Sequence, residues 1–245
     1  MILTWLRGYG LMVQWEWTRM LTWLPFLAAI QTILGGGTIL GFAFLVPDIN
    51  STTAAYLATG GPLLALAAIG LAVMPGMVSE ARTRGTFDFM QSLPLPPLAY
   101  PVAMLTVLIA VALPGMVLAL VIAVLRFHFV LHPSPLVIPA VALVGLTATA
   151  IGFMVALLTP NGTLANLAGN LMLFFILLFS PINFPPDRLP SWLAAVHRGL
   201  PIQYMADLFR GTLTGGGGLA LAFLVVGGWC IAALTTATSL SARRA

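Results

Sequence analysis

The sequence predicts an all-α membrane protein with six transmembrane helices in a single transmembrane domain, residues 1–245. Sixty per cent of the residues are hydrophobic, only 7% are charged and the mean hydropathy is +1.05, whereas a soluble domain has about 25% charged residues. Such a chain cannot cover itself with polar surface, so lipid has to be its solvent. The apolar stretches are uniform instead of alternating, which favours helices over the strands of a membrane barrel.

Six stretches reach the roughly 20 apolar residues that a helix needs to cross the hydrocarbon core. They are predicted near Leu24–Val46, Leu57–Val78, Leu98–Leu125, Leu136–Thr159, Leu164–Ile182 and Leu219–Leu240. The third stretch is long enough to tilt or kink, and Pro114-Gly115 near its middle gives a cause for a kink.

All ten basic residues are arginines, and their placement predicts the orientation. Six fall in segments that share a side with the termini, and four fall on the other side. Because positive residues favour the cytoplasmic side, both termini are predicted to be cytoplasmic. The lack of lysine hints at a GC-rich bacterial genome and thus at a bacterial inner (plasma) membrane. The arginines are scattered through loops, so we expect no nucleic-acid partner.

Residues 3–23 are too polar to span the membrane, yet they carry apolar side chains at helical spacing and four tryptophans. Tryptophan suits the headgroup level, so we predict an amphipathic helix in the cytoplasmic interface with membrane lipid as its partner. A frayed tail is the alternative. The apolar stripe consists of Leu3, Leu6, Tyr9, Val13, Trp17 and Met20.

Residues 183–211 are predicted to form two short amphipathic helices that dip into the outer leaflet as a re-entrant hairpin. Asp187 is the expected N-cap of the first helix, which ends before Pro201. The second helix is expected over Ile202–Phe209, with Gly211 as its stop. The apolar stripe of the first helix consists of Leu189, Trp192, Leu193 and Val196.

Charges are concentrated in one cytoplasmic segment, residues 79–97. Glu80, Arg82, Arg84 and Asp88 lie within nine positions of this weakly charged chain. The residues after Arg84 are predicted to form a short helix with an apolar and an acidic face, stopped by prolines. Such a helix below the membrane favours salt bridges to another protein. A topology signal alone would explain the arginines but not the acidic residues.

This segment also matches a known motif. The matching residues are Glu80, Arg82, Arg84, Gly85, Thr86, Phe87 and Asp88, followed by Leu93-Pro94. They resemble the "E-x-x-x-G-T-hydrophobic-acidic" signature of type-2 ATP-binding-cassette (ABC) exporter permeases, with one residue more between Glu80 and Gly85. In that family the segment is the coupling helix, which sits in a groove of the cytoplasmic ATPase. The chain departs from the family at Phe87, where an aliphatic residue is more frequent, and in its proline-rich residues 94–97.

The block between the fifth and sixth predicted spans resembles a second motif of the same permeases. The matching residues are Leu189, Pro190, Trp192, Pro201 and Arg210, and the N-cap candidate Asp187 lies in the same block. With the N-terminal interface helix and six spans, the resemblance covers nearly the whole chain. It implies a transport subunit that works as a dimer, with a second permease copy or a paralogue.

The sequence has no phosphate-binding loop, because that motif requires a lysine and the chain has none. The resemblance therefore implies a separate ABC ATPase subunit, and the chain itself is not expected to be an enzyme. ATP and Mg are expected on that partner, and no cofactor is expected in this chain. No metal site is predicted, since His128, His132, His197 and Cys230 lack the spacing of metal ligands.

Two predicted spans carry interior features that lipid does not favour. The resemblance assigns the first and fifth helices to the translocation path or the dimer interface, and packing within one subunit is the alternative. In the fifth span the candidate side chains recur at intervals of four residues, so they share one face of the helix. An amide inside the membrane needs a hydrogen-bond partner or water. The candidates are Gln31, Gly37 and Gly41 in the first span and Asn166, Asn170 and Phe174 in the fifth.

The predicted function is the permease subunit of an ATP-driven exporter that moves an amphipathic small molecule, such as a drug, an antibiotic or a lipid-like compound. The mostly apolar spans favour such a substrate over a long polysaccharide. One alternative is an exporter of a glycan or a lipid-linked substrate. The other is a membrane assembly or immunity factor that transports nothing, which would share the hydropathy but has no reason to carry both motifs.

Overall fold

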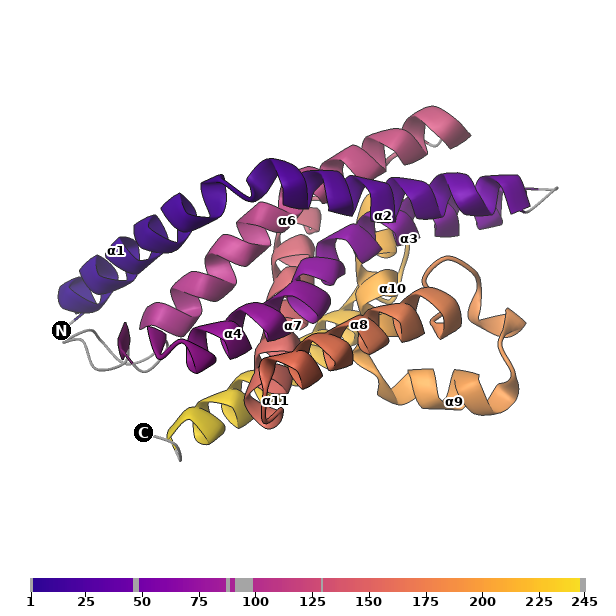
Figure 1. Ribbon diagram of the computed structural model, residues 1–245. Coiled ribbons are helices and arrows are strands. Elements are labelled where there is room, and N and C mark those ends of the chain that lie inside the picture. The colour runs from indigo at the N-terminus through magenta and orange to yellow at the C-terminus, as the bar shows by residue number, and fades with distance from the viewer. Residues whose placement is uncertain (1, 46–48, 87–88, 91–98, 129, 243–245) are drawn as a thin grey trace.

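The computed structural model describes residues 2–45, 49–86, 89–90, 99–128 and 130–242, and these contain helices and no strands (Figure 1). The helices in chain order are α1 (Ile2–Leu21), α2 (Leu24–Leu45), α3 (Ser51–Ala68), the π-helix η1 (Ile69–Val73), α4 (Met74–Thr83), α6 (Ala99–Phe127), α7 (Val137–Leu158), α8 (Gly162–Phe179), the 3₁₀ helix η2 (Pro186–Arg188), α9 (Ser191–Gly199), α10 (Pro201–Thr214) and α11 (Leu219–Ala242).

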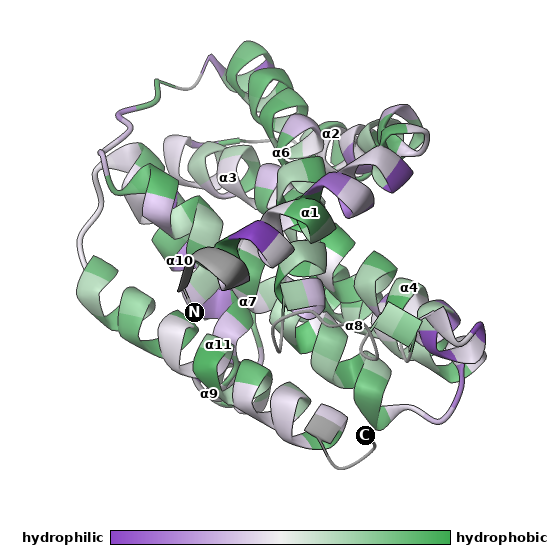
Figure 2. Cartoon of the chain, turned by 90° about the vertical axis from the view of Figure 1, so that its left-hand side faces the viewer, coloured by the Kyte–Doolittle hydropathy of each residue, from purple (hydrophilic) through white to green (hydrophobic). Residues whose placement is uncertain are grey.

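The prediction of six spans is confirmed, since six helical stretches in the described residues are long and apolar enough to cross a membrane. They are α2, the continuous stretch α3–η1–α4, α6, α7, α8 and α11. Both termini lie at one end of the molecule, and α9 lies at the other (Figure 1). Figure 2, seen from the end that holds the termini, shows mostly hydrophobic residues on the spans and hydrophilic residues on α1 and near the end of α4.

The second span differs from its predicted limits. It was expected to end at Val78, but the helix runs without a break over 33 residues, Ser51–Thr83. We call this stretch the central rod. It packs against α2, α6, α7, α8 and α10. The third span, α6, is likewise a single helix that continues through Pro114.

A π-helical turn interrupts the hydrogen-bond pattern of the central rod just before Pro75. Proline has no N–H, so it cannot donate to the carbonyl of Leu71. The Met74 N–H reaches back five residues to Ile69 instead, which is the π-helical pattern. A Cβ added at Gly169 of α8 would lie 2.6 Å from the Leu71 carbonyl oxygen, so this approach of α8 requires glycine.

Small residues also allow the other helices to approach the central rod. A Cβ at Gly35 of α2 would lie 2.7 Å from the carbonyl oxygen of Gly61 and 2.8 Å from the Cβ of Ala119. A Cβ at Gly152 of α7 would collide with the carbonyl oxygen of Gly70 in η1. Lipid tails are as apolar as the side chains, so close packing of this kind drives helix association in membranes.

Helix α1 packs along α6 and has nearly the predicted limits. The Tyr9 hydroxyl donates to Thr106 Oγ1 at 2.9 Å. The residues of the predicted apolar stripe are not all buried. Leu6 and Trp17 are exposed, whereas Met20 is buried. The most buried charged side chain on α1 is Glu16, which is 1% exposed. The position of α1 in the membrane interface stays a prediction.

The segment 183–211 contains two helices, as predicted, but their ends differ from those expected. Asp187 is not the N-cap of α9, because it lies in η2 and α9 follows Pro190. Gly211 does not stop α10 but lies inside it, close to Leu219 of α11. The helix continues to Thr214 and ends at Gly215, whose φ of 72° is the left-handed conformation that glycine adopts at no cost. Re-entry into the membrane stays a prediction.

We predict that Gly152→Val lowers the stability of the protein by about 2 kcal/mol or more, because the added methyl groups meet the Gly70 carbonyl in a packed interior. Unfolding can be followed with a thiol-reactive dye, since Cys230 is the single cysteine and is buried. Gly228→Val is the control, because a Cβ at that exposed position of α11 meets nothing within 4 Å. Equal melting of the two variants would contradict the packing described here.

Candidate functional site

The central rod ends in the charged segment singled out by the sequence. Helix α4 ends at Thr83, and Gly85 has a φ of 70°, which reverses the chain direction without steric cost. The Phe89 amide then donates to the Gly85 carbonyl at 2.9 Å, and the described residues Thr86, Phe89 and Met90 are helical. Phe87 and Asp88, which the sequence also selected, lie outside the described residues.

The charged side chains of Glu80 and Arg84 at this end are exposed. Arg84 Nη2 lies 2.6 Å from Glu80 Oε1, and the side chains are 73% and 58% exposed. An exposed pair of this kind contributes about 0–1 kcal/mol, so little free energy is lost when a partner takes over either charge.

Arg82 has a different position and points into the subunit. Its Nη1 donates to the carbonyl oxygens of Ala156 and Thr159 at 2.8 and 3.4 Å. The last carbonyls of a helix have no partner within the helix, and a cation suits them. Arg82 therefore fastens the end of α4 to the end of α7, and it does not present its charge outward as Arg84 does.

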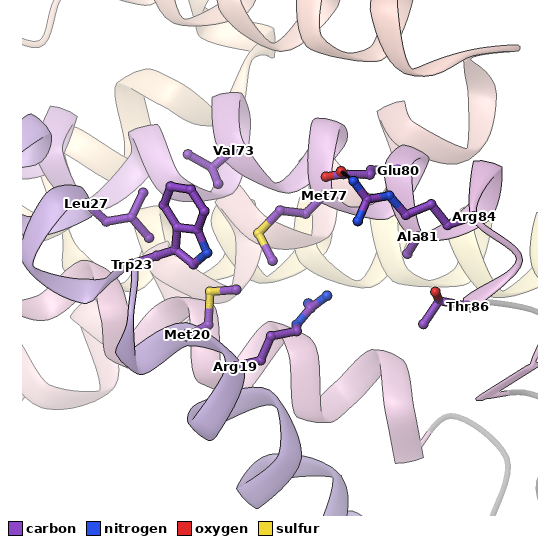
Figure 3. Close-up of a pocket in the computed structure, with 10 residues that line it drawn as sticks. All are labelled: Arg19, Met20, Trp23, Leu27, Val73, Met77, Glu80, Ala81, Arg84 and Thr86. Atoms are coloured by element: carbon purple, nitrogen blue, oxygen red, sulfur yellow. Dashed lines mark ion pairs between the residues drawn. The ribbon is translucent and has the colours of Figure 1, made fainter.

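The outward face of α4 separates two clefts. Val73, Met77, Glu80 and Arg84 line both of them. The cleft toward α1 and α2 has a volume of about 460 Å³ and is shown in Figure 3. The cleft toward α8 has a volume of about 810 Å³ and includes the side of Asn166.

The three candidate residues of the fifth span, Asn166, Asn170 and Phe174, all lie on the exposed side of α8. Asn170 Nδ2 donates to the carbonyl oxygen of Asn166 at 2.9 Å, and Phe174 is 59% exposed. The Asn166 side chain fills the space that a Cβ of Gly76 in α4 would take. Asn166 therefore packs against α4 of the same subunit. Asn170 and Phe174 instead lie on the exposed surface of α8.

Of the three candidates of the first span, two are exposed and one is buried within the subunit. Gly37 and Gly41 are exposed, and a Cβ at either position would meet nothing within 4 Å. Gln31 instead is buried to 1% exposure, where its Nε2 donates to the Ala65 carbonyl at 3.3 Å and its side chain packs on Gly115. Gln31 therefore joins α2 to the central rod and to α6, and it does not share the exposed face of the two glycines.

At the opposite end of the rod, Arg210 of α10 holds a polar cluster together. Its guanidinium donates to Thr59 Oγ1 at 3.1 Å, to the Ile182 carbonyl at 2.8 Å and to Asp207 Oδ1 at 3.1 Å. It also lies 3.7 Å from the ring centroid of Tyr56. The Arg210 side chain is 12% exposed. Burial raises the pKa of Asp207, and the nearby Arg210 charge acts in the opposite direction.

The other candidates of the outer segment do not join this cluster. Asp187 and Trp192 are exposed, and Leu189 and Pro190 link η2 to α9. Pro201 is buried at the first position of α10, where its missing N–H costs nothing.

Sequence reasoning missed the buried carboxylate Glu16 and the partners of Arg210 on α3. Glu16 lies four residues before Met20 and four after Met12, so helical spacing already placed it on the packed face of α1. No local pattern identifies Tyr56 and Thr59, because they meet Arg210 only through the packing of α3 against α10.

A scan against protein families matches residues 9–214 to the ABC-2 type transporter family. The chain belongs to this family. The match runs from α1 through α10, so it includes both ends of the central rod. An ABC-2 membrane domain is the transmembrane permease component of a transporter, lacks an ATPase domain of its own and pairs with an ABC ATPase subunit. Comparison with curated proteins found no match.

We predict that Arg210→Gln destabilises this permease by about 2–4 kcal/mol, since two buried acceptors, Thr59 Oγ1 on α3 and the Ile182 carbonyl, lose a charged donor. The stability of Arg210→Lys should lie between that of the parent protein and that of Arg210→Gln. An ammonium keeps the charge but lacks the planar fork that reaches Thr59 and Ile182 together. The thiol-dye melting curve of Cys230 measures the effect. Arg198→Gln on the exposed side of α9 is the control and should melt like the parent protein. If Arg210→Gln also melts like the parent, the cluster does not hold α10 to the rod.

Proposed function

We propose that this chain is the permease subunit of an ATP-driven exporter of an amphipathic small molecule, such as a drug, an antibiotic or a lipid-like compound. The observation that carries the proposal is the central rod, which joins an exposed charged segment to the interior of the membrane domain in one helical element of 33 residues. At about 1.5 Å per residue the rod is roughly 50 Å long, which exceeds the thickness of the hydrocarbon core.

In the proposed mechanism the ATPase subunit binds ATP and Mg and contacts the permease at Glu80, Arg84 and the residues after Gly85. Closure of the ATPase pair moves this segment, and the rod carries the motion because its end is fastened to α7 by Arg82. The π-turn at Ile69–Val73 is the place where the rod bends, since π-helical turns interrupt the regular hydrogen bonds of a helix.

The path itself is proposed to form between two permease copies or paralogues. The exposed surfaces of α2 and α8 carry glycines, amides and aromatic residues, and the α4 face with its two clefts lies between them. Small residues permit close approach of a second α2 helix. A surface that combines Asn170 with Phe174 offers both polar and apolar contacts, which suits an amphipathic substrate. In this proposal both termini lie in the cytoplasm, on the same side of the membrane as the ATPase.

We predict that Arg84→Glu and Gly85→Leu each reduce ATP hydrolysis by the reconstituted complex about tenfold, while insertion of the permease is retained. Arg84 is exposed and Gly85 has a positive φ, so these changes alter the partner-facing segment and spare the membrane interior. Arg126→Glu, on an exposed residue at the far end of α6, is the matched charge-reversal control.

The double variant Glu80→Arg with Arg84→Glu separates two roles of the pair. It restores the internal salt bridge but inverts both charges toward the ATPase. Activity that stays low supports recognition by the partner subunit. Full activity in the double variant, or normal activity in both single variants, would refute this assignment.

We also predict that Asn170→Leu and Phe174→Ala change which compounds stimulate the ATPase, with the complex still assembled. Gly41→Leu should instead lower the fraction of permease dimers, because the larger side chain stands on the face meant for close approach. Gly228→Leu on α11 is the control for dimerisation, since this exposed glycine lies on another span. An unchanged stimulation profile in both α8 variants would mean that α8 does not contact the substrate.

A further inference from the structure

Helix α9 lies at the end of the molecule opposite the termini (Figure 1). It packs against α10, and its last residue is bound by a span, since Trp229 Nε1 of α11 donates to the Gly199 carbonyl at 3.2 Å. Its buried face carries Leu193 and His197, which are one helical turn apart. The histidine is the residue of this face that meets α8.

The His197 ring is enclosed by apolar surroundings. The residue is 0% exposed, and its ring stacks on Phe175 of α8, with the centroids 6.0 Å apart and the planes inclined by 25°. Neither ring nitrogen has a hydrogen-bond partner of good geometry among the described residues. Burying a polar group without such a partner costs free energy. The ring is therefore held in this place by packing alone.

The carboxylates of the neighbouring elements do not balance a proton on this ring. Asp207 of α10 binds Arg210 at 3.1 Å, and Asp187 of η2 is exposed. Helix α8 has no titratable side chain. A charged His197 would thus have no anionic partner within the described part of the chain. The other titratable residues of η2, α9, α10 and α11 are Arg188, Arg198, Tyr204 and Cys230.

Acidity therefore acts against the packed position of this histidine. A histidine in water has a pKa of about 6.5, whereas burial lowers the pKa of the packed His197, with the Phe179 carbonyl acting in the opposite direction. The released ring consequently takes up a proton first as the pH falls. Below about pH 6.5, each further pH unit favours release by up to about tenfold, until the pH reaches the lowered pKa of the packed ring. At neutral pH the ring is uncharged and stays packed.

The surroundings of His197 also form part of an apolar cleft. This cleft has a volume of about 700 Å³ and lies between α8 and the helices α7, α10 and α11. Phe175 and Phe179 line it from α8, Leu200 lines it directly after α9, and Trp229 lines it from α11. Departure of the histidine would leave the Phe175 ring without its stacking partner. Release of α9 therefore loosens the wall of the cleft at the end opposite the termini.

We propose that His197 is a pH-sensitive latch of this permease. On the side of the membrane opposite the termini, protonation drives the ring out of its place against Phe175, and the end of α9 separates from α8. The apolar cleft then opens, so acidity on that side controls access to it. The latch depends on the burial of one side chain and not on the identity of a transported compound. It therefore goes beyond the proposed export function.

The test measures how accessible the buried face of α9 is in the complete complex with its ATPase subunit in nanodiscs. In a Cys230→Ser background, one variant carries Leu193→Cys on the buried face, and the matched control carries Ser191→Cys on the exposed face of the same helix. Labelling of the permease by a water-soluble thiol reagent is followed by mass spectrometry at about pH 7.5 and at about pH 5.5. The ratio of the two labelling rates cancels the effect of pH on thiol reactivity. We expect the ratio of Leu193→Cys to Ser191→Cys to rise about tenfold at the lower pH.

Substitutions of the three histidines identify the group that responds. His197→Phe keeps a ring that can stack on Phe175 but takes up no proton, so its ratio should stay low at both pH values. His128→Gln and His132→Gln, at the other two histidines of the chain, should keep the full response. A ratio that does not change with pH while His197 is present would overturn the proposal, and so would a response that persists in His197→Phe.

Hydrogen exchange of the unsubstituted complex gives a second readout that requires no change in α9. After correction for the intrinsic effect of pH, the amides of α9 should exchange severalfold faster at the lower pH. The amides of α7, which has no titratable residue, should not. Unchanged exchange of α9 would contradict the latch. Equal acceleration of α7 and α9 would show general unfolding by acid and would also overturn it.

Discussion

Close approach of helices around the second span is the constraint on which the rest of this structure depends. The central rod is surrounded by α2, α6, α7, α8 and α10, and most of its membrane-spanning part is buried. Inside a membrane, apolar contact with a neighbouring helix gains little over contact with lipid, so the association requires tight packing. Glycines at the crossing points make this packing possible, and Gly35, Gly152 and Gly169 each stand against a backbone carbonyl of the rod.

The π-turn of the rod shows how one proline affects several neighbours. Pro75 cannot donate a hydrogen bond, the chain changes to a π-helical pattern, and the carbonyl of Leu71 is left facing α8. Only a glycine at position 169 accommodates that carbonyl. Backbone polarity inside the membrane is thereby shielded by a close neighbour instead of by water, as the hydrocarbon requires.

The same rod connects the two polar ends of the molecule. At the end with the termini, Arg82 binds the last carbonyls of α7 and leaves Glu80 and Arg84 exposed. At the other end, Arg210 binds Thr59 and the Ile182 carbonyl, so α10 and the chain after α8 are attached to α3. The central rod is therefore attached to neighbouring helices at both ends, by Arg82 at one end and by Arg210 at the other. A displacement of one end acts on the whole rod. This arrangement suits the permease of an ABC-2 transporter, in which ATP is hydrolysed by another subunit.

The sequence by itself determined the membrane class, the six spans, the shared face of Asn166, Asn170 and Phe174, and the motifs of the family. These follow from hydropathy and from the helical period, which are local properties of the chain. The tertiary structure alone decided that Gln31 and Arg82 bind within the subunit whereas Gly37 and Arg84 remain exposed. It also decided that Glu16 is buried and that Arg210 meets Tyr56. The physical reason is that burial and hydrogen bonding depend on which helices pack together, and residues on one helix with similar chemistry face different neighbours.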